Sequence, residues 1–238
     1  IAVSETSGTA NNDGTICSNS SATLTASGAV SYLWSTNANT ATTTVSAAGT
    51  YTVTATNANG CTGTATFNLT VQPAPVVAIS GPLSFCAGGG STLIASGSVA
   101  NYLWNTNAAT SSITVSTAGI YTVTATNANN CIATSAATVV VNPLPIMSCP
   151  INQIVCADAS GIVLTGASPS EGDYSGNGVN AGVFNPVVAG PGAHLITYAY
   201  TNTNGCYNSC TFSITVRAQL NGSIAAATDN VLIYATSN

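Results

Sequence analysis

The chain has 238 residues, of which 3% are charged, and a formal net charge of −5. Arg217 is its one Lys or Arg, so the composition excludes the basic patch that nucleic acid or anionic lipid requires. No run approaches the ~18 apolar residues of a membrane span, and an apolar fraction of 45% is too high for a disordered chain. These features favour a folded protein that takes its polarity from Ser, Thr, Asn and Gly.

Eight cysteines, an even number, recur at regular spacings without the His and acidic partners of a metal site. We therefore expect disulfides, no cofactor, and an extracellular or cell-surface location, because such bonds persist outside the cytosol. The chain starts at Ile1 with neither an initiator Met nor a signal peptide. This start is typical of an excised piece of a longer precursor.

An internal repeat organises the first two thirds of the chain. Residues 32–34 (YLW) recur at 102–104, and residues 51–59 (YTVTATNAN) recur unchanged at 121–129, both at an offset of 70 residues. Cys61 corresponds to Cys131 at that offset. The two stretches are therefore near-copies of one unit.

A third, more distant unit follows. Residues 201–206 (TNTNGC) match residues 56–61 (TNANGC) at five of six positions. Pro-x-Pro pairs, which form short and rather stiff connections, punctuate the joins at 73–75 and 143–145. The predicted domains are repeat 1 (1–73), repeat 2 (74–143), a divergent repeat 3 (144–217), and a C-terminal strand segment or the start of a further domain (218–238).

The pattern of every unit predicts strands. Tyr51, Val53 and Ala55 alternate with threonines, the period of two that marks a half-buried strand. Glycines and Asn-rich clusters supply turns between short strands, and no helical period occurs. We predict an all-β chain of tandem Ig-like β-sandwich domains, each stapled by intradomain disulfides.

The repeat also suggests how the cysteines pair. If each copy is closed on itself, every ring spans about 45 residues and stabilises the fold by about 4 kcal/mol in the loop-entropy model. Repeat 3 holds four cysteines, two of which match the repeat positions while the others form an outer bridge by elimination. The expected pairs are Cys17–Cys61, Cys86–Cys131, Cys156–Cys206 and Cys149–Cys210.

These units resemble a known family. Residues 24–28 (LTASG), 32–36 (YLWST) and 49–61 (GTYTVTATNANGC) are similar to the Ig-like, or PKD-like, repeats of large secreted surface proteins of Bacteroidota. Residues 172–179 (GDYSGNGV) resemble a second subtype of the same repeats. The resemblance implies export through an outer membrane, commonly by type IX secretion, and a role in adhesion, gliding or surface structure.

Two tryptophans, Trp34 and Trp104, admit two interpretations. As exposed aromatics they would stack on sugars, in which case the chain would be a set of carbohydrate-binding modules. As residues of a central strand they would pack in the core, as the tryptophan of Ig-type sandwiches does. Tyr32 and Tyr102 share their strand parity, which favours the core.

Catalytic and metal-binding candidates are few. His194 is the sole general-base candidate, and no nucleophile or carboxylate lies at a motif spacing from it. Glu171 and Asp173 form the one close acidic pair, a weak candidate for Ca²⁺ in a glycine-rich loop that otherwise predicts turns. We therefore expect no catalysis and no resident metal.

The lack of charge points to self-association. Residues 74–143 contain no Asp, Glu, Lys, Arg or His, so the charges that normally keep sheet edges apart are missing there. Near the C-terminus, Val231, Leu232, Ile233 and Tyr234 are candidates for a strand added to a neighbouring subunit. The expected function is a structural stalk or filament segment of a bacterial surface adhesin, with neighbouring repeats, a surface glycan or a host or substratum ligand as partners.

Overall fold

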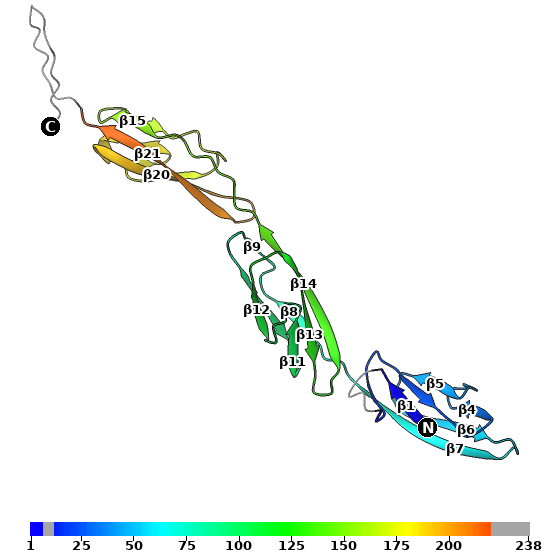
Figure 1. The fold of residues 1–238 in the computed structure, drawn as a ribbon. Coiled ribbons are helices and arrows are strands. Elements are labelled where there is room, and N and C mark those ends of the chain that lie inside the picture. The colour runs from blue at the N-terminus through cyan, green and yellow to red at the C-terminus, as the bar shows by residue number, and fades with distance from the viewer. Residues whose placement is uncertain (7–11, 220–238) are drawn as a thin grey trace, which may run out of the picture. The chain divides into compact units, whose positions relative to one another are not determined.

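A computed structural model describes residues 1–6 and 12–219 of the chain (Figure 1). They divide into two compact units, Ile1–Val141 and Asn142–Asn238. Almost all of the regular structure is β-strand, and the one helix in the described ranges has four residues. Among these residues no helix has the length and apolar character needed to cross a membrane.

Repeat 1 is a sandwich of two sheets. The first has the order β1-β3-β5 and the second the order β2-β7-β6-β4. All pairs are antiparallel except β2, which runs parallel to the end of β7. The strands are β1 (Ala2–Glu5), β2 (Thr15–Cys17), β3 (Ala22–Thr25), β4 (Ser31–Trp34), β5 (Thr42–Val45), β6 (Gly49–Thr56) and β7 (Thr62–Gln72).

Repeat 2 has the same two-sheet order, β12-β10-β8 and β11-β13-β14-β9. The near-copies in sequence are therefore near-copies in topology. The strands are β8 (Ala78–Ser80), β9 (Ser84–Cys86), β10 (Ser91–Ser96), β11 (Asn101–Trp104), β12 (Ser112–Val115), β13 (Gly119–Thr126) and β14 (Ile132–Asn142).

Details of both repeats are those of Ig-like domains. Tyr51 donates its hydroxyl hydrogen to the carbonyl of Ala47 at 2.7 Å, and Tyr121 does the same to Thr117 at 3.0 Å. This is the tyrosine corner that fixes the strand entering the sandwich. Alternation fills the core as the sequence predicts, since Tyr121, Val123 and Ala125 are buried while the threonines between them are partly exposed.

Repeat 3 is a sandwich with different details. A sheet in the order β15-β21-β20-β17 faces a small one in the order β16-β19-β18. Its core is built around Phe184, Ile196 and Ile214, each fully buried. The strands are β15 (Gln153–Cys156), β16 (Ile162–Val163), β17 (Asp173–Ser175), β18 (Val179–Asn180), β19 (Val183–Phe184), β20 (Gly192–Thr201) and β21 (Tyr207–Arg217).

A short helix, α1 (Pro186–Ala189), interrupts this strand-only pattern. The side chain of Asn185 caps it by accepting from the backbone N–H groups of Val187 (3.0 Å) and Val188 (3.3 Å), and Pro186 occupies the first turn. The sequence pattern predicts strands throughout and gives no sign of this turn, because four residues are too few to show a helical period.

Three separate hydrophobic clusters fall within the predicted limits of repeats 1, 2 and 3. The compact units, however, number two, because repeats 1 and 2 belong to one of them. Residues 220–238 of the C-terminal segment, including the contact candidates Val231, Leu232, Ile233 and Tyr234, lie outside the described residues.

Candidate functional site

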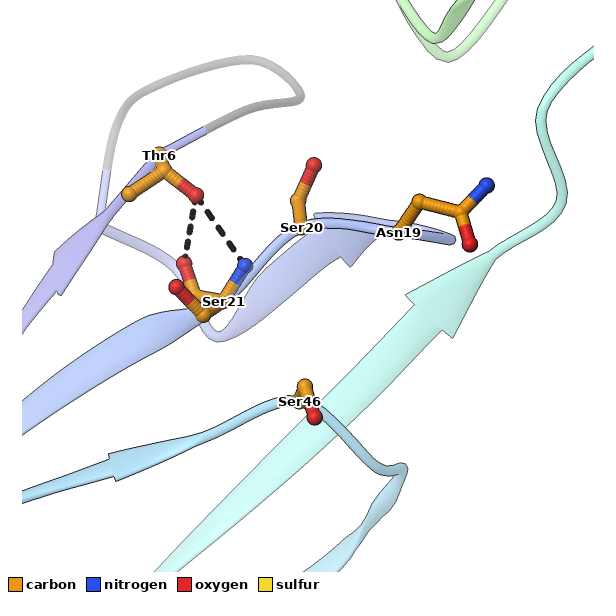
Figure 2. A pocket seen from close by; sticks show the side chains of 5 residues that line it. All are labelled: Thr6, Asn19, Ser20, Ser21 and Ser46. Carbon is orange, nitrogen blue, oxygen red and sulfur yellow. Dashed lines mark hydrogen bonds between the residues drawn. The ribbon is translucent and has the colours of Figure 1, made fainter.

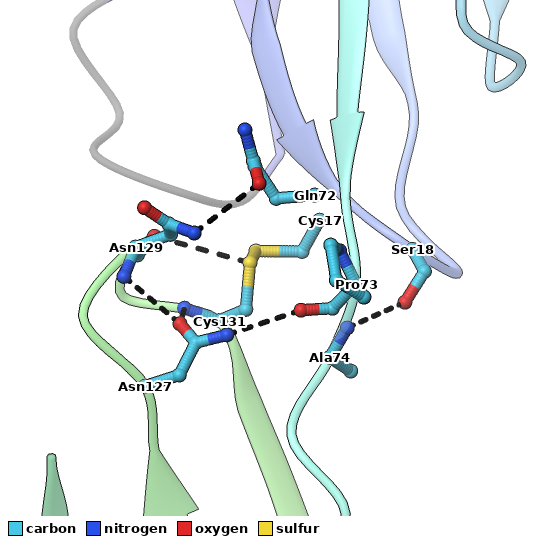
Figure 3. Close-up of a disulfide and its surroundings, with 8 residues drawn as sticks. All are labelled: Cys17, Ser18, Gln72, Pro73, Ala74, Asn127, Asn129 and Cys131. Carbon is cyan, nitrogen blue, oxygen red and sulfur yellow. Dashed lines mark hydrogen bonds between the residues drawn. A yellow bond between two sulfur atoms is a disulfide. The ribbon is translucent and has the colours of Figure 1, made fainter. Parts of the chain in front are cut away.

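The feature that stands out chemically is a disulfide that joins two repeats. Cys17 of repeat 1 is bonded to Cys131 of repeat 2, with a Cα–Cα distance of 5.5 Å (Figure 3). Both side chains are buried, at 5% and 1% exposure. The expected bond between Cys17 and Cys61 is therefore wrong, and Cys61 is an exposed free thiol.

Strand length explains the correction. Cys17 ends β2 and lies beside Gln72, the last residue of β7, whereas Cys61 directly precedes the first residue of β7. An 11-residue strand places its two ends about 35 Å apart. Because a disulfide requires Cα atoms within about 7 Å, the two cysteines of repeat 1 cannot meet.

The same geometry corrects two other pairs. Cys131 is bonded to Cys17, so it does not pair with Cys86, and Cys156 is free and exposed, so it does not pair with Cys206. Cys86 and Cys206 are both disulfide-bonded. The outer bridge of repeat 3, Cys149–Cys210, is present as expected, with a Cα–Cα distance of 5.9 Å.

Hydrogen bonds surround the Cys17–Cys131 bond and hold the connection between the repeats (Figure 3). The Nδ2 group of Asn127 donates to the carbonyl of Pro73 at 3.0 Å, and Nδ2 of Asn129 donates to Oε1 of Gln72 at 3.2 Å. The backbone N–H of Ala74 donates to Oγ of Ser18 at 2.9 Å. The Pro-x-Pro connection is thus fixed to both repeats by covalent and polar contacts.

A recurring asparagine turn presents the second cysteine of each repeat. Oδ1 of Asn127 accepts from the backbone N–H groups of Asn129 and Cys131, both at 3.0 Å. Such a side chain closes a tight turn by replacing a backbone acceptor. Sequence reasoning identifies this cluster as a turn but misses its role, because nothing in the pattern shows which repeat supplies the partner sulfur.

Trp34 and Trp104 are core residues, each 1% exposed. Their indole N–H groups donate to the carbonyls of Thr40 and Thr110, both at 2.9 Å, so the polar edge is satisfied inside the sandwich. Neither ring can stack on a sugar. The carbohydrate-binding interpretation requires exposed aromatic side chains, and these two tryptophans do not provide them.

His194 lies on β20, half-buried, with both ring nitrogens engaged. Nε2 donates to the carbonyl of Gly190 at 2.8 Å, and Nδ1 accepts from Nδ2 of Asn177 at 3.3 Å. The ring also packs near Phe184, with ring centroids 6.0 Å apart. These partners fix one tautomer and use both nitrogens for local structure.

The acidic candidates stand apart from any ligand cluster. Glu171 and Asp173 are exposed, and the described ranges hold no group of three or more His, Cys, Asp or Glu residues placed to bind a metal.

The sequence pattern gives no sign of the role of Glu5, whose carboxylate accepts from the backbone N–H groups of Asn12 (3.1 Å), Gly14 (2.5 Å) and Thr15 (3.2 Å). Glu5 organises that turn.

An open polar depression of about 610 Å³ lies on repeat 1 (Figure 2). The hydroxyl of Thr6 bridges the backbone of Ser21, donating to its carbonyl at 2.7 Å and accepting from its N–H at 3.0 Å. The depression offers neither an aromatic face nor an acid–base pair. It is lined by Thr6, Asn19, Ser20, Ser21 and Ser46.

No protein-family model matches this chain, and no curated protein matches it. Among solved structures it is similar to a Ca²⁺-stabilised adhesin of an Antarctic ice-binding bacterium, at 16% identity and a TM-score of 0.38 over 93% of this chain and 75% of that one. It is also similar to a 1.5-MDa bacterial ice-binding adhesin, at 15% identity and a TM-score of 0.38 over 91% of this chain and 98% of that one. A third similar structure is Sidekick-1 immunoglobulin domains 1–5, at 13% identity and a TM-score of 0.29 over 79% of this chain and 52% of that one.

Likenesses at such identities and TM-scores carry no argument about ligands or assembly. The Ig-like character of the repeats rests on their own strand order and tyrosine corners.

Proposed function

We propose that the chain is a non-catalytic, extracellular structural segment, a stalk or filament piece of a cell-surface adhesin. The observation that carries this proposal is the disulfide between repeats, Cys17–Cys131. A disulfide that only stabilises a domain can lie anywhere within it. A disulfide that links successive repeats adds a second covalent connection to the one that the backbone already makes.

The mechanical consequence follows from the path of the chain. Tension that enters through residues 1–16 passes from Cys17 directly to Cys131 and leaves through β14. The stretch between the two cysteines, whose sequence separation is 114, is bypassed. At about 3.5 Å per extended residue, roughly 40 nm of chain cannot be drawn out while the bond is intact.

The disulfides and the hydrogen bonds of His194 support the same proposal. Three bonds among buried or partly buried cysteines are typical of oxidising compartments outside the cytosol. His194, the one general-base candidate, donates from Nε2 to the carbonyl of Gly190 and accepts at Nδ1 from Asn177. Adhesion itself would come from a surface or ligand that these repeats carry outward.

Single-molecule stretching of the full chain tests the proposal, with free thiols capped by N-ethylmaleimide beforehand. All proteins compared carry Cys86→Ser and Cys206→Ser, because a bond made by these two cysteines would also shorten the path of the tension. In that background Cys17→Ser/Cys131→Ser should lengthen by about 40 nm more than its parent when unit 1 unfolds. A matched variant, Cys149→Ser/Cys210→Ser, opens a 61-residue ring in repeat 3 and should add only about 20 nm. Equal extension of the Cys86→Ser/Cys206→Ser parent and its Cys17→Ser/Cys131→Ser derivative would contradict a force-bearing junction.

A second measurement addresses location. Antibodies raised against residues 74–143 should label the surface of unpermeabilised cells that produce the protein. Labelling only after permeabilisation would overturn the proposal.

A further inference from the structure

Two free thiols, Cys61 and Cys156, lie in positions where the other repeats form disulfides. All eight cysteines fall within the described ranges, and the other six are bonded. We propose that Cys156 of one copy forms a disulfide with Cys61 of a second copy, so that copies join head to tail by the junction that joins repeats 1 and 2. This inference rests on the proposed structural function and names its partner.

Cys61 occupies the same turn as the bonded Cys131. Oδ1 of Asn57 accepts from the N–H groups of Asn59 at 2.9 Å and Cys61 at 3.0 Å. The corresponding distances around Asn127 are 3.0 Å and 3.0 Å. The turn of repeat 3 before the bonded Cys206 is built in the same way, with 3.0 Å for both bonds to Oδ1 of Asn202.

Cys156 occupies the same position as the bonded Cys17. Each ends a short strand that runs parallel to the end of a long one, Cys17 beside Gln72 and Cys156 beside Arg217. The following N–H donates to the same long strand in both cases, Ser18 to Gln72 at 2.7 Å and Ala157 to Arg217 at 2.9 Å. Cys156 is therefore placed to reach the second cysteine of a following repeat.

None of the other cysteines within residues 1–238 can complete either position. The two cysteines after Cys156, Cys206 and Cys210, are bonded, and residues 218–238 contain none. Before Cys61 there is only Cys17, which is bonded to Cys131. The partner sulfur comes from outside these 238 residues, and a second copy offers both missing positions at once.

The space beside Gly28, at the Cys61 end of repeat 1, supplies the second line of evidence. In repeat 2 the preceding connection covers the sandwich end, where Val77 packs against the core and a Cβ on Gly97 would collide with the carbonyl of Val76. At the equivalent Gly28 of repeat 1 a Cβ would meet nothing within 4 Å. At the Cys61 end of repeat 1, the described part of residues 1–238 contributes no segment equivalent to the 73–77 connection of repeat 2.

Apolar and polar residues both line this end of repeat 1. A depression of about 200 Å³ lies between the sheets there, and its walls include Ile1, Ala26, Val53 and Ala55. Ala55 is half-buried, whereas its counterpart Ala125 in repeat 2 is fully buried. A chain segment arriving from a second copy would bury this surface as the 73–77 connection does in repeat 2.

The contacts of the new junction follow from the existing one. Asn127 donates to the carbonyl of Pro73, the residue directly after β7, and Asn202 donates at 3.2 Å to Pro143, the residue directly after β14. By the same rule Nδ2 of Asn57 donates to the carbonyl that follows β21, which belongs to Ala218 of the second copy.

The bond forms by thiol–disulfide exchange with an oxidant of the disulfide class, such as a disulfide oxidoreductase or oxidised glutathione. The thiolate of Cys61 attacks one oxidant sulfur and releases the other as a thiolate. The thiolate of Cys156 then attacks the Cys61 sulfur and releases the second oxidant thiolate. Two protein thiols become one disulfide, and the oxidant takes up two electrons and the two protons.

The experiment uses the full chain, incubated with oxidised glutathione and analysed without reductant. Wild type should form a ladder at multiples of 23.4 kDa that dithiothreitol collapses to monomer. Cys61→Ser alone and Cys156→Ser alone should remain monomeric, while their mixture should give a dimer and nothing larger. Peptic digestion of that dimer should yield one peptide pair containing Cys61 and Cys156.

Two controls separate a specific junction from random oxidation. Thr62→Cys in the Cys61→Ser background moves the exposed thiol by one residue, onto β7, and should form no ladder. Ser27→Trp, which fills the depression, should abolish the ladder, whereas Thr44→Trp on β5 should leave it unchanged.

Each alternative outcome overturns the proposal. Dimers formed equally by either single variant alone indicate symmetric random oxidation. Free thiols at both positions after oxidation indicate no junction at all. A bond from Cys61 to a cysteine of a longer native polypeptide identifies a different occupant. The stretching experiment on the Cys17–Cys131 bond is independent of all three, so it still decides the proposed function.

Discussion

Repeats 1 and 2 carry the same nine residues at 51–59 and 121–129, yet the cysteine that follows behaves differently in each. Cys131 is 1% exposed and bonded, whereas Cys61 is exposed and free. The turns are the same within 0.1 Å in their hydrogen bonds. The difference arises from the neighbour, because repeat 2 follows another repeat within this chain. The environment of a repeat is therefore completed by the unit before it.

The largest expected effect comes from breaking the bond that distinguishes the two repeats. Cys17→Ser/Cys131→Ser removes a link across 114 residues, for which the loop-entropy model assigns about 5 kcal/mol of unfolding free energy. Urea unfolding followed by tryptophan fluorescence measures it, since both tryptophans lie in repeats 1 and 2. Cys149→Ser/Cys210→Ser should leave that signal unchanged. An unshifted midpoint in the first variant contradicts the prediction.

The second prediction concerns what the repeats share. Trp34→Ala and Trp104→Ala should each lower the unfolding free energy by about 4 kcal/mol, because both rings are 1% exposed and make the same hydrogen bond. Circular dichroism during denaturation provides the measurement. Phenylalanine at either position keeps most of the volume and should cost less than half as much. A large inequality between the two alanine variants would break the equivalence of the cores.

A smaller effect on stability is expected from the hydrogen bond between Asn127 and the connection of repeats 1 and 2. Asn57→Ala and Asn127→Ala both remove the acceptor of two backbone N–H groups, but Asn127→Ala also removes the bond to Pro73. It should therefore cost about 1 kcal/mol more than Asn57→Ala. Denaturation of both variants with Cys17–Cys131 intact measures the difference. Equal losses would show that the Asn127–Pro73 contact adds nothing.

The smallest effect is expected from pH and salt. Repeat 2 has no Asp, Glu, Lys, Arg or His, so nothing in it titrates between pH 5 and 8 and no ion pair is screened. In the Trp34→Phe protein, where Trp104 reports on repeat 2, unfolding free energy should change by less than about 0.3 kcal/mol across that range and between 0.05 and 0.3 M salt. A larger change of the unfolding free energy with pH or salt would mean that repeat 2 is coupled to charges elsewhere. The Trp104→Phe protein, in which Trp34 reports on repeat 1, gives the comparison.

The strands were predictable from sequence because their signals are local. The alternation around Val53, the turn at Asn57 and the core position of Trp34 each depend on a few neighbouring residues. The short helix at Pro186 was not predictable, because a single turn shows no period. The turn held by Glu5 was missed because its acceptor lies several residues away in sequence.

The cysteine pairs depend on tertiary structure, which local sequence patterns do not contain. Cys149–Cys210 follows by elimination, but the other pairs were assigned by assuming that each repeat closes on itself. The length of β7 contradicts that assumption, since an uninterrupted 11-residue strand separates the positions of Cys61 and Cys17. The unbroken run 62–72 was the available signal, although its parallel pairing with β2 is a tertiary fact that no local pattern contains.

Arg217 has a consequence for survival outside the cell. Proteases that cut after Lys or Arg find a single such residue in 238, and it is the last residue of β21, paired with Cys156 in the sheet. Such enzymes cut most readily where the backbone is free to enter their cleft as an extended strand, and a residue in a ladder must first be released. The composition that removes charge from the repeats thus also leaves trypsin-like enzymes almost no place to cut.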